Sequence, residues 1–188
     1  MQAREAALEI ARRLKAAGHE ALLAGGCVRD KLLGREPKDF DIATSARPAE
    51  VLALFPKSNE VGAHFGVVIA KHRGHHIEIA TFRTDGCYKD GRRPESVTFS
   101  TPEEDAQRRD FTVNGLFERP DTGEIIDHVG GVADLRAKRL RAIGDPVARF
   151  QEDALRLLRA IRFSTVLGFE IEPETMAAIT TCAGLLER

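Results

Sequence analysis

The segment AGGCVRDKLLGREPKDFDIAT, residues 24–44, joins a Gly-Gly pair to an Asp-Phe-Asp triplet through a predicted helix at about residues 27–33. The apolar run EALLAG, residues 20–25, precedes it and predicts a buried strand. Gly25 and Gly26 let the backbone approach a phosphate, and the start of the helix supplies free N–H groups. Arg29, one turn into the helix, can add a charge-assisted contact. Taken alone, the segment is equally well explained as a plain strand-to-helix turn, because it matches neither the P-loop nor the dinucleotide-binding fingerprint.

Asp39 and Asp41 lie in KDFDIAT, residues 38–44, which predicts a second strand. Side chains at positions i and i+2 of a strand project from the same face. Two carboxylates held that close repel each other unless a cation lies between them, and their hard oxygens suit Mg²⁺. A lone Asp-x-Asp is more often a solvated turn, but here Phe40 and Ile42 alternate with the aspartates. With the glycine turn, the pair predicts a site for a nucleoside triphosphate and its metal.

The composition limits the class of protein. Hydrophobic residues make up 43% of the 188-residue chain, enough for one domain, or for one domain and part of a second. A formal net charge of −1 means that any nucleic-acid contact must be local. No apolar run approaches the about 20 residues of a membrane span, and the N-terminus has no signal-peptide segment. Cys27, Cys87 and Cys182 include no C-x-x-C pair, so we expect neither disulfides nor zinc, and a cytoplasmic location.

The pattern along the chain predicts an α+β part followed by an all-α part. Helices are expected over residues 2–17, from Pro48, and from the capping-box residue Thr101 through residue 117. Besides the two strands above, strands are expected at residues 65–72 and 75–83, joined at Gly74, and from residue 124, with residues 84–100 rich in turns. From about Asp145 the pattern is helical only, with one amphipathic helix or two and then another. We therefore expect domains over residues 1–144 and 145–188.

Glu78 stands between Ile77 and Ile79 in the predicted strand HHIEIATFR. A carboxylate on an otherwise apolar strand costs several kcal/mol if it is buried without a partner. Two interpretations are equal on this pattern: a third carboxylate of the metal site, or a glutamate on an edge strand that faces water.

The segment RRDFTVNG, residues 108–115, places Asp110 and Asn114 four residues apart in the helix predicted there. At that spacing they share a face and could exchange hydrogen bonds with sugar hydroxyls, while Arg109 contacts a phosphate. The alternative is a solvated helix face with one i,i+4 pair.

In EDALRLLRAIR, residues 152–162, one polar arc is predicted to hold Glu152, Asp153, Arg156, Arg159 and Arg162. A solvent-exposed helix face on which Glu and Arg side chains form ion pairs would give the same pattern. The charge count favours a binding surface, because residues 136–162 carry eight basic and three acidic side chains, a local net charge of +5. That is the local basic surface that binding of an acidic polymer requires.

These motifs occur together and in order, along with DHVGGVADL at residues 127–135. The chain thereby resembles the catalytic head of the class II tRNA nucleotidyltransferase and bacterial poly(A) polymerase family, in the polymerase-β nucleotidyltransferase superfamily. The resemblance implies a mixed sheet flanked by helices, followed by an all-α neck. It implies that Asp39 and Asp41 are metal ligands and that Glu78 is the third carboxylate. It also implies a nucleotide-binding set of Gly25, Gly26, Arg29, Arg109, Asp110, Asn114, Asp153, Arg156, Arg159 and Arg162.

The activity implied by this resemblance is template-independent addition of CMP and AMP, from CTP and ATP, to the 3′ end of tRNA with two Mg²⁺ ions. Poly(A) addition shares every motif and is the alternative, although YKDGRRPESVTF, residues 88–99, looks more like CCA-adding members. A non-catalytic nucleotide- or RNA-binding module is a more distant alternative. No oligomeric state follows from the pattern.

Two features depart from the family pattern. Gly115 stands where the family more often has alanine, and we expect little effect beyond looser helix packing. Family members usually continue into helical body and tail regions, which implies that these 188 residues are a fragment.

Overall fold

A computed structural model of the chain describes residues 2–60, 65–86, 88 and 95–187. Cys87 and most of the loop that looked like CCA-adding members, residues 89–94, lie outside the described residues. Within the described part, no helix is long and apolar enough to cross a membrane.

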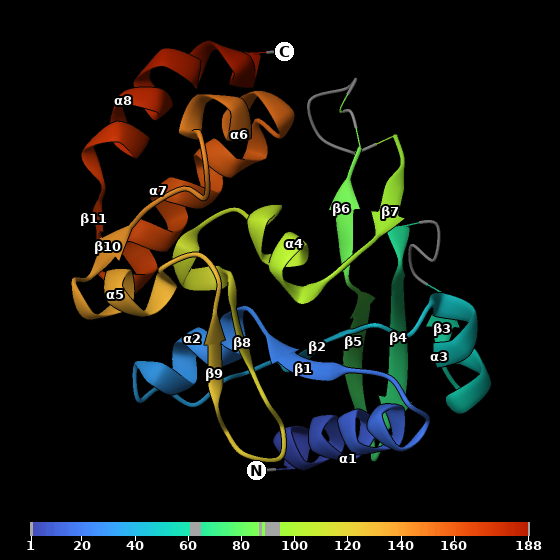
Figure 1. Cartoon of the computed structure of the whole chain (residues 1–188). Coiled ribbons are helices and arrows are strands. Elements are labelled where there is room, and N and C mark those ends of the chain that lie inside the picture. The colour runs from blue at the N-terminus through green and yellow to red at the C-terminus, as the bar shows by residue number, and fades with distance from the viewer. Residues whose placement is uncertain (1, 61–64, 87, 89–94, 188) are drawn as a thin grey trace.

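One mixed sheet organises the first part of the chain (Figure 1). In the described residues its strands run in the order β3-β4-β5-β2-β1-β8-β9. Only the pairing of β2 with β5 is parallel, and the other pairings are antiparallel. The strands are β1 (Ala21–Ala24), β2 (Asp41–Thr44), β3 (Asn59–Glu60), β4 (Val67–His72), β5 (His75–Thr81), β8 (Leu116–Glu118) and β9 (Ile125–Asp127). The predicted α+β class and mixed sheet are confirmed.

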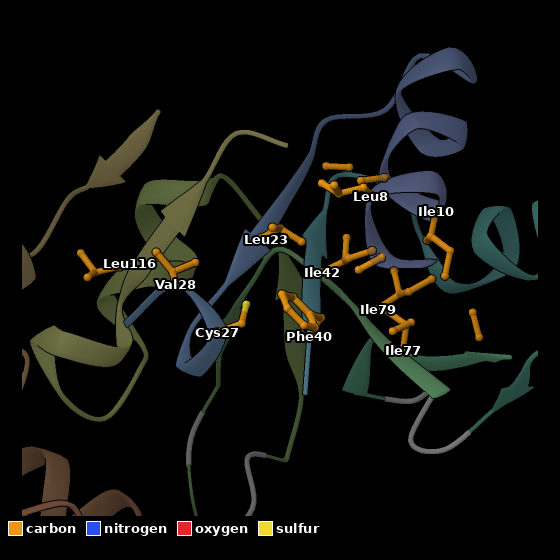
Figure 2. Close-up of a cluster of buried hydrophobic side chains, with 14 of the residues drawn as sticks. Leu8, Ile10, Leu23, Cys27, Val28, Phe40, Ile42, Ile77, Ile79 and Leu116 are labelled. Carbon is orange, nitrogen blue, oxygen red and sulfur yellow. The ribbon is translucent and has the colours of Figure 1, made fainter. Parts of the chain in front are cut away.

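The main core lies between this sheet and α1 (Gln2–Ala16). Figure 2 shows Leu8 and Ile10 of α1 pointing toward Ile42, Ile77 and Ile79 of β2 and β5. All five side chains are less than a tenth exposed, and burying each one contributes about 1.5–3 kcal/mol. Helices α2 (Gly26–Leu32) and α3 (Pro48–Leu54) add Val28 and Val51 to the same core.

The opposite face of the sheet is covered over β1 and β2. There α4 (Pro102–Gln107) contributes Ala106 to a smaller cluster with Leu22, Ala43, Phe82 and Phe117. Strand residues alternate between faces, so Asp41 and Glu78 project on this second side, opposite to Ile42 and Ile79. The fold therefore places both carboxylates on the face of the sheet that α4 partly covers and not in the main core.

The helix predicted from Thr101 through residue 117 is wrong beyond α4. Thr101 begins α4 with the predicted capping box, but the chain leaves the helix at Arg108. Phe111 then forms an antiparallel bridge with Ala142, a 3₁₀ turn covers Thr112–Asn114, and β8 follows. Pairing with segments distant in sequence overrides the local helical pattern here.

Two further expectations about strands are wrong. Residues 84–100 were expected to be rich in turns and no strand was predicted there, yet β6 (Arg83–Asp85) and β7 (Val97–Phe99) pair as an antiparallel ribbon. The strand expected over residues 38–44 begins only at Asp41, so Asp39 lies two residues before its start. The argument that Asp39 and Asp41 share one face of a strand therefore lacks its premise, although the charge of Asp39 still acts on Asp41, and their joint role stays a prediction.

The C-terminal part is mainly helical and packs beside the sheet domain (Figure 1). Its helices are α5 (Gly131–Arg136), α6 (Pro146–Glu152), α7 (Leu155–Leu167) and α8 (Pro173–Cys182), with a 3₁₀ turn at Ala183–Glu187. The segment after Asp145 forms two helices because Asp153 interrupts them with extended backbone at φ −142°. Strand β10 (Arg139–Leu140) pairs with β11 (Glu170–Ile171), so backbone pairing crosses the predicted domain boundary at residue 144. The division at that residue stays a prediction.

Gly115 ends the 3₁₀ turn rather than lying in a helix, which changes the expectation for alanine there. A Cβ at this position would lie 2.7 Å from Val129 Cγ2 and 3.2 Å from Ile143 Cδ1. Gly115→Ala should therefore destabilise this protein by about 1–3 kcal/mol through overpacking. Chemical denaturation can measure the loss, and Val129→Ala in the same chain should recover part of it. A loss that Val129→Ala does not reduce would contradict the packing explanation.

Candidate nucleotide-binding site

A polar pocket of about 450 Å³ lies where the second face of the sheet meets α7. It collects side chains from segments far apart in the sequence. Its lining residues are Gly25, Gly26, Arg29, Asp41, Arg108, Arg109, Asp110, Asn114, Asp153, Arg156, Arg159 and Phe163. The structure thus brings together nine of the ten predicted nucleotide-binding residues, all except Arg162, along with Asp41.

Gly25 is the residue whose missing side chain shapes one end of the pocket. Its φ of 70° is in the left-handed region that favours glycine, and a Cβ would lie 3.2 Å from Arg109 Nη1. Gly26 has no such constraint, since a Cβ there would lie 3.7 Å from Arg29 Nη2. In this structure the group that lies against Gly25 is the Arg109 guanidinium, and the approach of a phosphate to this glycine stays a prediction.

Asp41 lies beside Arg109 at this end of the pocket. Burial by the surrounding protein, with the negative charges of Glu78 and Asp39, raises the pKa of Asp41 to about 6, although the positive charge of Arg109 acts to lower it. The residue as a whole is nevertheless exposed at the pocket surface. Asp41 and Glu78 are direct neighbours on the parallel strands β2 and β5. Because β5 pairs with β4 on its other side, the interpretation of Glu78 as an edge-strand residue is wrong.

The acidic groups here fit a divalent cation by their charge. Glu78 and Asp39 both repel the ionised form of Asp41, and Arg109 is the cation that offsets them. Placing a divalent ion among such carboxylates removes the repulsion. In the described residues no three His, Cys, Asp or Glu side chains are grouped so that they could hold a metal ion by themselves. Solvent or phosphate oxygens would therefore have to complete a coordination shell.

The raised pKa of Asp41 predicts a pH-dependent cost to folding. An unfolded aspartate ionises near its ordinary pKa of 3.8, and the folded one only near 6. Between these values the folded state binds the proton more tightly, so stability falls as pH rises through the window. Asp41→Asn removes this cost. Without divalent cations, its melting temperature should exceed that of the parent by more at pH 7.5 than at pH 4.5. An equal difference at both pH values would contradict the shift.

Asp110 and Asn114 are bonded to each other, although not on the helix that predicted their proximity. Asn114 Nδ2 donates to Asp110 Oδ1 at 3.1 Å, and Arg29 Nη1 donates to Asn114 Oδ1 at 2.6 Å. From α7, Arg159 Nε and Nη2 both donate to Asp110 Oδ2, at 2.8 and 2.5 Å. One hydrogen-bonded chain therefore joins α2, the 3₁₀ turn and α7 across the pocket.

Asp153 and Arg156 line the pocket from the junction of α6 and α7. Asp153 Oδ1 accepts a hydrogen bond from Leu155 N at 3.0 Å and so satisfies the start of α7. Arg156 is 7% exposed and donates to Glu152 Oε2 and to the carbonyls of Arg149 and Arg108. The single polar arc predicted for residues 152–162 is interrupted at Asp153, where the helices separate.

The basic surface predicted for residues 136–162 is only partly available. Arg162 lies outside the pocket, and several of the other basic residues form ion pairs. Arg162 is exposed outside the pocket, with its guanidinium 5.0 Å from the Phe163 ring centre. Arg149 and Arg156 pair with Glu152, Arg159 pairs with Asp110, and Arg141 pairs with Asp134. Four of the eight basic residues that suggested a surface for an acidic polymer therefore form ion pairs with acidic side chains of the same chain.

Two lining residues were not singled out from the sequence. Arg108 was quoted in the RRDFTVNG motif but given no role, and its position next to Arg109 was the available signal. Phe163 has the guanidinium groups of Arg29 and Arg159 at 5.3 and 5.1 Å from its ring centre. In sequence it lies within an apolar helical pattern and cannot be told from an ordinary core phenylalanine.

Comparison with known proteins agrees with this geometry. The family described as "Poly A polymerase head domain" matches residues 21–141. A CCA-adding enzyme of Geobacillus stearothermophilus is 50% identical over 96% of this chain and 45% of its own length. Another, of Latilactobacillus sakei, is 50% identical over 97% of this chain and 46% of its own length. The chain thus spans less than half the length of these curated relatives.

Solved structures show the same likeness. The chain is similar to the Bacillus stearothermophilus CCA-adding enzyme in complex with CTP, with a TM-score of 0.88, 46% identity, and coverage of 97% of this chain and 44% of that one. It is also similar to the Thermotoga maritima CCA-adding enzyme complexed with tRNA, with a TM-score of 0.79, 28% identity, and coverage of 97% and 42%. The family predicted from the sequence motifs is confirmed, and this chain belongs to the family of poly(A) polymerase head domains.

Proposed function

We propose that this chain is the nucleotide-binding head of a CCA-adding enzyme. The proposed reaction is template-independent transfer of CMP and AMP from CTP and ATP to the 3′ end of tRNA. The observation that carries the proposal is the pocket itself, which is lined by Gly25, Asp41 and Arg109 from the sheet domain and by Asp153 and Arg156 from the junction of α6 and α7. Carboxylates beside arginines suit a metal-bound triphosphate, and a second Asp–Arg pair suits a base edge. The names of the similar proteins support this choice.

The carboxylate end is assigned to the reacting groups. Asp39 and Asp41 would contribute oxygens to Mg²⁺, with two ions proposed, Glu78 would be the third carboxylate nearby, and solvent or phosphate oxygens would complete the coordination shell. Arg109 would contact the triphosphate beside Gly25. When bound, such ions activate the attacking 3′-hydroxyl and stabilise the departing pyrophosphate. The short approach between Gly25 and Arg109 keeps this part of the pocket narrow, so a phosphate there lies against backbone and guanidinium together.

The hydrogen-bonded chain in the middle is assigned to the sugar. Asp110 and Asn114 would accept from and donate to ribose hydroxyls, because each already presents a polar group between Arg29 and Arg159. Arg29 and Arg159 would add positive charge near the phosphates, while Arg162 would act from outside the pocket. Asp153 and Arg156 would read the base, because an aspartate only accepts hydrogen bonds and an arginine only donates them.

The organisation of the chain is part of the same proposal. Residues 1–144 would form the catalytic head and residues 145–188 the start of a helical neck, which supplies Asp153, Arg156 and Arg159 to the pocket. The proposed setting is the cytoplasm, where tRNA is the RNA partner.

One experiment separates this function from its alternatives. The full-length protein is incubated with tRNAs lacking A, CA or CCA, and with an unrelated RNA, each with a single nucleotide at a time. A CCA-adding enzyme should add CMP only to tRNAs lacking CA or CCA, and AMP only to tRNA lacking A. Repeated AMP addition to any RNA, without CMP addition, would indicate a poly(A) polymerase. No addition with bound nucleotide would indicate a non-catalytic module.

A further inference from the structure

We propose that Asp105 is a positioning residue that fixes Arg108 and Arg109 for binding of the nucleotide triphosphate. The inference rests on the proposed function and assigns a role to a residue that does not line the pocket. Asp105 lies on α4 and is 1% exposed. Its two carboxylate oxygens each receive one arginine, so a single side chain organises both pocket guanidinium groups of RRDFTVNG.

The contacts form a double fork. Arg109 Nε and Nη2 donate to Asp105 Oδ2 at 3.1 and 2.9 Å. Arg108 donates to Oδ1 through Nε at 2.8 Å and lies 2.7 Å away through Nη2. Two-point contacts between guanidinium and carboxylate fix direction as well as distance. Asp105 Oδ1 also accepts from Arg83 N at 3.3 Å, which anchors the fork to β6.

The environment favours the charged form of Asp105. Burial raises its pKa, but the charges and hydrogen bonds of Arg109 and Arg108 outweigh burial, and the pKa is lowered overall. A buried carboxylate kept ionised in this way depends on both arginines, and they depend on it. Without it, two adjacent guanidinium groups would repel each other and take other rotamers.

The consequence is the orientation of Arg109. With Nε and Nη2 held by Asp105, Nη1 faces the backbone of Gly25 and Asn114 O, the latter at 3.5 Å. The Phe117 ring supports the guanidinium at 4.9 Å. An arginine already held in its binding geometry loses less conformational freedom when the phosphates arrive. Asp105 therefore acts through Arg109 and need not touch the nucleotide.

The test uses equilibrium binding by the full-length protein without RNA, titrated with ATP, CTP and adenosine in the presence of Mg²⁺. Asp105→Asn should weaken ATP and CTP binding by about tenfold or more, the scale of one lost charge-assisted contact. Adenosine binding should not change, nor should the ratio of the ATP and CTP affinities. A purely structural role would weaken all of these ligands together. Unchanged ATP affinity, or an equal loss for adenosine, would overturn the proposal.

Asp134→Asn is the matched control. Asp134 is 3% exposed and also bonds an arginine, Arg141 Nε at 2.9 Å, but this pair lies outside the pocket. It should cost stability without changing ATP affinity. If Asp105→Asn does not fold, Asp105→Glu keeps the charge but displaces it by one methylene, and it should show the same selective loss.

A double variant tests whether Asp105 affects ATP binding through Arg109. If Asp105 acts through Arg109, Asp105→Asn should cause little further loss of ATP affinity in an Arg109→Ala background. Fully additive losses would overturn the proposal. A parent protein that binds neither ATP nor CTP would overturn the proposed function and this role together. Normal parent binding with no selective effect of Asp105→Asn would overturn only the positioning role.

Discussion

Asp41→Asn is expected to abolish nucleotide transfer by the full-length protein while leaving the fold intact. The amide has the shape of the carboxylate but not its charge, and it cannot balance a divalent cation. Metal-ion stabilisation of a transition state contributes several kcal/mol, so a loss of at least about a thousandfold in kcat/KM is expected. Asp41 is accessible in the pocket and is destabilised when ionised, so the variant should fold and melt no lower than the parent at pH 7.5.

The measurement is single-turnover addition of CMP or AMP to tRNA at saturating Mg²⁺. Asp121→Asn is a suitable control, because Asp121 is an exposed carboxylate that pairs with Lys15 outside the pocket. It should retain parental rates. Turnover by Asp41→Asn within a few fold of the parent would remove Asp41 from the metal site and with it the proposed role of this end of the pocket.

Replacing Asp153 and Arg156 together by alanine is expected to relax the choice of base. Cytosine and adenine each present an amine donor beside an acceptor ring nitrogen, and uracil and guanine present the reverse. An aspartate only accepts and an arginine only donates, so Asp153 and Arg156 match the first pattern. A wrong base leaves buried groups unpaired at about 1–3 kcal/mol each, which corresponds to about tenfold to a hundredfold discrimination per contact.

The readout is the ratio of kcat/KM for ATP and CTP to that for UTP and GTP. A ratio is needed because Arg156 also donates to the carbonyls of Arg108 and Arg149, so its loss should lower stability as well. The control is Arg119→Ala with Glu124→Ala, which removes an exposed acid–arginine pair of the β8–β9 hairpin. If the Asp153 and Arg156 double variant still rejects UTP and GTP as the parent does, base reading lies elsewhere.

Local chemistry made several features predictable. The strand, Gly-Gly turn and helix around Gly25 depend on neighbouring residues, as does the β4–β5 hairpin, where Arg73 and Gly74 take φ of 47° and 81°. Thr101 and Glu104 form the capping box that their spacing predicts. The pairing of Asp105 with Arg108 and Arg109 also follows the i,i+3 and i,i+4 rule and was open to sequence reasoning.

Pairing between segments that are distant in sequence explains the wrong secondary-structure predictions. The helical pattern of residues 101–117 is local, but Phe111 bridges to Ala142 and β8 pairs with β1, and both interactions connect segments that a short window cannot relate. The contact between Asp110 and Asn114 was predicted for a wrong reason, since the 3₁₀ turn and not an α-helix brings them together.

The sequence by itself determined the family and most residues of the pocket, because the motifs are short and each one carries its own local geometry. Only the tertiary structure decided the place of Glu78, which the sequence left equally open. Strand order and register are set by packing across the whole sheet, and they put β5 beside β2 with Glu78 opposite Asp41. The same is true of Phe163 and Arg159, which reach the pocket only because α7 packs against the end of the sheet domain.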